Sequence, residues 1–171
     1  MGLLKRLFGG GRGLGYESAP PRDHAIVAGL FLAPRDDVTT WDMASATPDE
    51  WPAVEFNGLG PVELGMLESI ISGVSYEQID QDDLLAPLRD GGEEGPWIIP
   101  VRPALVDALT QLSPQQIESV AKAWAKTEEM SWPWGQSRQA TADLAQQLER
   151  VADLAHQSRE TGRPMFLLMS L

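Results

Sequence analysis

Met165-Phe166-Leu167-Leu168-Met169-Ser170-Leu171 is the stretch that decides the fold, because six of its seven residues are apolar. Exposing so much apolar surface costs free energy, so the stretch is predicted to be a strand inside a sheet. Its predicted neighbour is the apolar run of residues 24–33, which lies between Arg22-Asp23 and Pro34-Arg35. The length of that run and its branched side chains are typical of a buried strand.

Helices are predicted where apolar residues recur with a helical period. Gly73 and Gly162 are expected to end two of them, and Ser113-Pro114-Gln115-Gln116 begins another as a capping box. Pro100 confines residues 97–101 to an edge strand or an extended connector. The predicted fold class is α+β, with a small sheet that pairs the strands 24–33 and 165–171 and is covered by four or five helices. The helices are expected at residues 61–72, at 75–88 with Ser75 and Gln78 as a cap, from Pro103 onward, at 113–130 and at 137–161.

Two segments are distinguished along the chain. Residues 23–171 are predicted to form a single α+β domain, since their number is sufficient to bury a core. Residues 1–22 are predicted to be a basic, glycine-rich tail. Within it, residues 3–8 form an amphipathic turn that allows weak contact with an anionic membrane surface. No apolar run is long enough for a membrane-spanning helix, and a cytoplasmic location is expected.

The charge pattern is the strongest indication of function. Residues 36–88 hold twelve carboxylates and no lysine, arginine or histidine, which matches the net charge of −12. Such charges are solvated, paired from elsewhere in the chain, or available to a basic partner. Glu63 and Glu68 are expected to face water, and the arginines that offer distant pairing are Arg138, Arg150 and Arg159. This acidity excludes nucleic acid as an expected ligand, because phosphate binding needs clustered cations.

The residue types for several kinds of catalysis are missing. The chain has no cysteine, so disulfides, thiolate nucleophiles and the usual structural zinc sites are excluded. His24 and His156 do not have the spacing of a metal site, and Asp80-Gln81-Asp82-Asp83 lacks the glycine and glutamate of a calcium loop. The glycine-rich stretch at residues 9–15 lacks the lysine of a phosphate loop. No metal and no cofactor are therefore expected.

The six tryptophans fall into two groups. Trp97 and Trp124 lie in apolar, periodic segments and are predicted to be core residues. The other four, Trp41, Trp51, Trp132 and Trp134, lie in proline-containing stretches, where they either cap the core or form an aromatic contact surface. Acidic residues beside Trp41 and Trp51 favour a surface that contacts another protein. The candidate binding residues are Trp41, Asp42, Trp51, Asp80, Asp82 and Asp83.

Three features of residues 95–171 carry a resemblance: Gly95-Pro96-Trp97, the run Val120-Ala121-Lys122-Ala123-Trp124-Ala125-Lys126-Thr127-Glu128-Glu129, and residues 162–171. With these features the chain resembles a group of small actinobacterial proteins of unknown function. The resemblance implies a single domain and carries no activity over to this chain.

Three functional hypotheses follow from these patterns. The first is a non-enzymatic acidic module that binds a basic protein by charge steering and aromatic anchors. The second is a hydrolase or lyase whose carboxylates come together from distant segments, with raised pKa values as their signature. The third is a membrane-edge or small-ligand accessory protein that uses residues 3–8.

Overall fold

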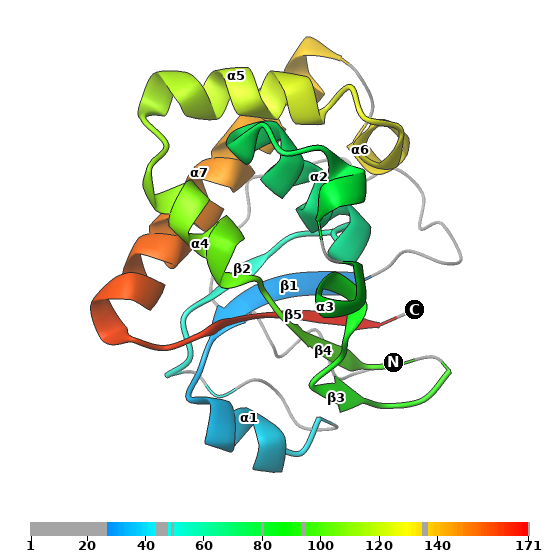
Figure 1. Cartoon of the computed structure of the whole chain (residues 1–171), viewed down its shortest axis with the longest axis vertical. Coiled ribbons are helices and arrows are strands. Elements are labelled where there is room, and N and C mark those ends of the chain that lie inside the picture. The colour runs from blue at the N-terminus through cyan, green and yellow to red at the C-terminus, as the bar shows by residue number, and fades with distance from the viewer. Residues whose placement is uncertain are drawn as a thin grey trace.

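The computed structural model describes residues 27–43, 48, 50–79, 81–93, 95–134 and 137–170. In this part of the chain, five strands form one antiparallel sheet with the order β2-β1-β5-β4-β3 (Figure 1). The strands are β1 (Val27–Leu32), β2 (Ala53–Glu55), β3 (Arg89–Asp90), β4 (Trp97–Pro100) and β5 (Met165–Ser170).

The predicted pairing of the two apolar strands is confirmed. β5 lies at the centre of the sheet and pairs with β1 from Val27↔Ser170 to Leu32↔Met165. Figure 1 shows the two strands, blue and red, side by side. The predicted strand residues 24–26 and 171 lie outside the described residues.

Most of the helices cover one face of the sheet, and α1 lies on the other (Figure 1). The α+β class is therefore confirmed. The helical elements are α1 (Arg35–Thr40), α2 (Pro61–Ser72), the 3₁₀ turn η2 (Tyr76–Gln78), α3 (Gln81–Leu85), α4 (Pro103–Thr110), α5 (Pro114–Trp124), α6 (Glu128–Trp134) and α7 (Arg138–Thr161).

The predicted helix ends are confirmed where glycine and serine mark them. Gly73 ends α2 with a φ of 74°, and Gly162 ends α7 with a φ of 69°, both in the left-handed region that favours glycine. Ser113 begins α5 with the complete capping box, in which its side chain and that of Gln116 each bond the other's backbone amide.

Two predicted helices are wrong in extent. The helix at residues 75–88 is replaced by η2 and α3, and the Ser75 hydroxyl donates to the Glu77 carboxylate instead of capping a helix. The helix at residues 113–130 ends at Trp124, because the amides of Lys126 and Thr127 turn back to the carbonyls of Ala123 and Trp124. A separate helix, α6, then begins.

Two segments are also more regular than predicted. Residues 36–60, whose prolines at positions 48 and 52 favour irregular structure, contain most of α1 and all of β2. β4 is not an edge strand, because it pairs with both β5 and β3. Pro100 is tolerated there because β3 pairs only with Trp97 and Ile98 and ends before it.

The sheet is buried on both faces, which explains the continuous apolar sequence of β5. Leu30, Leu32 and Leu167 point into the larger core beneath the helices. Phe31, Phe166 and Leu168 point to the opposite side, where they form a smaller cluster with Val38 of α1 and with Trp51. Among the described residues, no helix is both long and apolar enough to cross a membrane.

Candidate functional site

Exposed carboxylates gather over the smaller cluster, on α1 and on the segments that flank it. We call Asp36, Asp37, Asp42 and Glu50 the acidic face; all four are exposed. Asp36, Asp37 and Glu50 form no ion pair with any described residue. The first two lie in the first turn of α1, where the helix dipole favours negative charge.

Arg89 of β3 holds α1 in place. Its Nη1 donates to the carbonyl oxygens of Val38 at 3.0 Å, Thr39 at 2.7 Å and Trp41 at 3.1 Å. These carbonyls lie at the end of α1, where backbone acceptors lack partners within the helix. Arg89, which directly follows the acidic tract, therefore binds backbone oxygens instead of neutralising carboxylates.

Trp41 and Trp51 cap the smaller cluster. The Trp51 ring stacks on Phe31, with ring centroids 5.6 Å apart and planes 8° apart, and only 7% of the residue is exposed. Trp41 packs edge-on against both rings and is half-buried, and its Nε1 finds no acceptor among the described residues. Of the two, Trp41 offers more surface to a partner.

The predicted binding residues that the structure describes do not form one surface. Trp41, Asp42 and Trp51 lie together on the α1 side of the sheet, whereas Asp83 lies on α3, which packs beside α2. Asp80 lies outside the described residues, and only the backbone of Asp82 is described.

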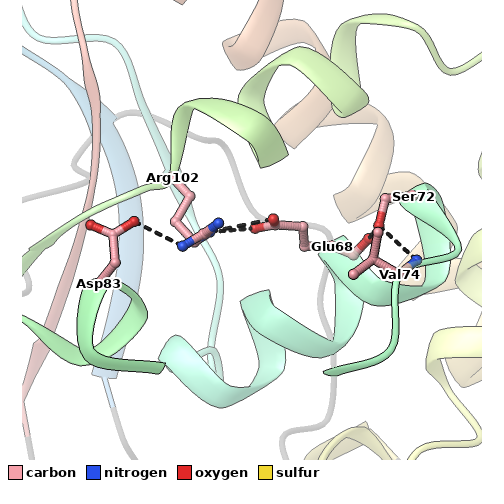
Figure 2. A network of polar contacts seen from close by, with 5 residues as sticks. All are labelled: Glu68, Ser72, Val74, Asp83 and Arg102. Atoms are coloured by element: carbon pink, nitrogen blue, oxygen red, sulfur yellow. Dashed lines mark hydrogen bonds and ion pairs between the residues drawn. The ribbon is translucent and has the colours of Figure 1, made fainter. Parts of the chain in front are cut away.

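Asp83 belongs instead to an ion-pair network centred on Arg102 (Figure 2). Arg102 lies between β4 and α4. Its Nε donates to the Glu68 carboxylate of α2 at 3.1 and 3.3 Å, and its Nη1 donates to Asp83 at 2.8 Å. The Asp83 side chain is 63% exposed, whereas that of Glu68 is only 7% exposed.

The expectation that Glu68 faces water is therefore wrong. Glu68 follows Leu64 and Leu67 on the buried side of α2, where an unpaired carboxylate would be very costly. Its partner is Arg102 rather than one of the arginines named from the sequence. Arg159, one of those three, pairs with Asp107 outside the acidic tract.

The tryptophans predicted to be core residues differ from each other. Trp124 is 1% exposed and its Nε1 donates to the Glu63 carbonyl at 3.2 Å, so the core prediction is confirmed. Trp97 is only half-buried, and its Nε1 donates to the exposed Asp90 carboxylate. Of Trp132 and Trp134 only the backbone, within α6, is described.

The charge of Glu129 acts on the ionisation of Glu63, and both carboxylates act on the ionisation of Tyr76. Burial raises the pKa of Glu63 above its ordinary value of 4.5, the backbone amides of Glu63 and Gly60 lower it, and the charge of Glu129 raises it. Burial likewise raises the pKa of Tyr76, as do the charges of Glu129 and Glu63. Glu63 lies in the first turn of α2, beside the backbone amides that lower its pKa.

The raised pKa of Glu63 predicts a pH-dependent stability. The folded protein binds the proton of the Glu63 carboxyl group more tightly than the unfolded chain does. The contribution of this group to the free energy of unfolding is therefore complete below the unfolded pKa near 4.5 and is lost as pH rises through the folded pKa. Relative to Glu63→Gln, the wild-type protein should therefore lose stability as pH rises above 4.5. Urea unfolding across this range measures the difference. The prediction is contradicted if the difference in stability between the wild-type protein and Glu63→Gln does not change with pH. It is also contradicted if Glu128→Gln, a substitution at an exposed site, gives the same pH dependence.

Basic residues gather in a different place, a groove between α5 and α7. Its volume is about 810 Å³. Lys122, Lys126 and Arg138 line it together with polar Gln115, Ser119 and Thr141, and the small side chains Ala125, Ala142 and Ala145 widen it. Among the described lining residues, Glu118 alone is acidic. The sequence pattern did not single out this groove.

No metal site is found in the described part of the chain. There, no group of three or more histidine, aspartate or glutamate side chains is arranged to hold an ion. His156 is exposed on α7, and His24 lies outside the described residues.

Comparison with protein-family models, with curated proteins and with solved structures finds no match to this chain. The likeness to small actinobacterial proteins therefore stays a prediction.

Proposed function

We propose that this protein is a non-enzymatic binding module whose acidic face engages a basic protein. The observation that supports the proposal most is that three carboxylates of the acidic face have no ion-pair partner among the described residues. The carboxylates of Asp36, Asp37 and Glu50 are exposed and form no ion pair with a described residue. Arg89, Arg102 and Arg159 are instead bound within the fold.

The physical consequence is a negative electrostatic potential over one side of the sheet, which attracts positively charged partners. Exposed charges of one sign speed the approach of an oppositely charged partner and set its orientation. Trp41 lies at the same place and is half-buried, so it supplies an aromatic contact of the kind enriched at interface hot spots. Asp83 contributes less to this surface, because Arg102 already neutralises part of its charge.

The decisive experiment compares two variants that lose the same charge. Asp36→Asn with Asp37→Asn removes two carboxylates from the acidic face, and Glu149→Gln with Asp153→Asn removes two exposed carboxylates from α7. We expect a basic partner, captured from native lysate at low salt and then purified, to associate about fivefold more slowly with the first variant. Its association with the second variant should match that of the wild-type protein.

Two results would contradict the proposal. Equal slowing by both variants would mean that net charge, rather than the acidic face, governs binding. An association rate that does not depend on salt would exclude charge steering altogether. Surface plasmon resonance at several ionic strengths distinguishes these cases.

The other two hypotheses gain less support. Glu63 and Glu129 are carboxylates from distant segments, but backbone amides act against the rise in the pKa of Glu63. The membrane-edge hypothesis rests on residues 3–8, which lie outside the described residues.

A further inference from the structure

We infer that the groove between α5 and α7 is a binding site for a small polyanion that carries phosphate or carboxylate groups. This inference is independent of the proposed function, because the groove lies on the helical side of the sheet and the acidic face on the other. A small ligand is the occupant because a volume of about 810 Å³ falls within the range of small-molecule sites, about 300 to 1,000 Å³.

The first argument is the placement of the cations. The whole sequence has three lysines, and two of them, Lys122 and Lys126, line this groove. Arg138, in the first turn of α7, lines it as well. None of the three forms an ion pair with a described residue, in contrast to Arg102 and Arg159. Cations of a strongly acidic protein would lower their energy by pairing with its carboxylates, so unpaired cations in one groove favour an external anion.

The second argument is the chemistry of the lining. Lysine supplies a compact charge with three donors, and arginine supplies a planar fork that fits phosphate and carboxylate groups. Gln115, Ser119 and Thr141 add hydrogen-bonding groups beside them. The α7 segment contributes its N-terminal turn, where the helix dipole favours negative charge. Three cations against Glu118 leave the groove with an excess of positive charge.

The test is calorimetric titration of the full-length protein with pyrophosphate and, separately, with citrate. Saturable binding of one or both is expected, and the stronger of the two identifies phosphate or carboxylate as the recognised group. Lys122→Gln with Lys126→Gln should weaken binding at least about tenfold, as removal of charged hydrogen bonds does. Arg35→Gln with Arg150→Gln, which makes the same charge change at exposed sites outside the groove, should leave the affinity within about twofold.

Three results would overturn the inference. The first is the absence of saturable binding at about 10 mM of either probe. The second is an equal loss of affinity in both double variants, which would mean that the anion binds elsewhere or binds nonspecifically. The third is self-association of the protein, seen by sedimentation, that weakens with salt, is lost in the lysine variant and prevents the probes from binding. That result would mean that a second copy of this chain occupies the groove. Circular dichroism of each variant checks that the helices remain folded.

Discussion

Replacing Arg102 with methionine is expected to lower the free energy of unfolding by about 3 kcal/mol, measured by urea denaturation. The Glu68 carboxylate is nearly inaccessible to water, and the guanidinium of Arg102 is its partner at 3.1 and 3.3 Å. Without that partner, a buried charge stays unpaired among the apolar side chains of α2 and α4. We expect the lower end of the range for broken buried pairs, because Arg102 itself is 18% exposed.

Two further variants separate this cause from a general loss of packing. Asp83→Asn removes the exposed partner of Arg102 and should cost less than about 1 kcal/mol. The double variant Glu68→Met with Arg102→Met should recover most of the lost stability, because a buried pair can be replaced by apolar residues of similar volume. If the double variant is no more stable than Arg102→Met, the unpaired carboxylate is not the cause.

Replacing Trp124 with alanine is expected to lower the free energy of unfolding by about 3 to 5 kcal/mol. The side chain is 1% exposed, lies 5.7 Å from Phe56 between ring centroids, and bonds the carbonyl of Glu63. It joins α5 to α2 and to the segment after β2. Removing it leaves a cavity beneath the helices that neighbouring side chains fill only in part.

Graded substitutions test this cause by urea denaturation. Trp124→Phe keeps most of the ring and loses the hydrogen bond, so it should cost about 1 to 2 kcal/mol. Trp97→Ala is the matched control, because Trp97 is half-buried and its indole bonds an exposed carboxylate. A loss for Trp97→Ala as large as that for Trp124→Ala would show that burial does not explain the difference.

The parts of the fold that were predicted are those specified by local sequence. The apolar runs of β1 and β5 exceed what an exposed strand tolerates, and Gly73 and Gly162 adopt a backbone conformation that other residues avoid. The capping box at Ser113 likewise needs only neighbouring residues. For these elements, local preference and tertiary structure agree.

The parts that were missed depend on packing between distant segments. The spacing of Leu64, Leu67, Glu68 and Ile71 places the glutamate on the apolar stripe of α2, and this was the available signal for its burial. Nothing local identified Arg102 as its partner. Lys122 lies on α5 and Lys126 lies two residues beyond its end, but Arg138 joins them only because α7 packs against α5. The predicted aromatic surface is smaller than expected, because Trp51 stacks on Phe31 and is buried.

The central position of β5 has a consequence for how the chain acquires its structure. Among the described residues, β5 follows every other strand in sequence, and it alone joins the β2–β1 pair to the β4–β3 pair. Its pairing with β1 closes a loop that contains nearly the whole described chain, so this contact has a very high sequence separation and a large entropic cost of closure. During synthesis, the apolar edges of β1 and β4 therefore stay unpaired until β5 has left the ribosome, and this is the period in which the nascent chain is most exposed to aggregation.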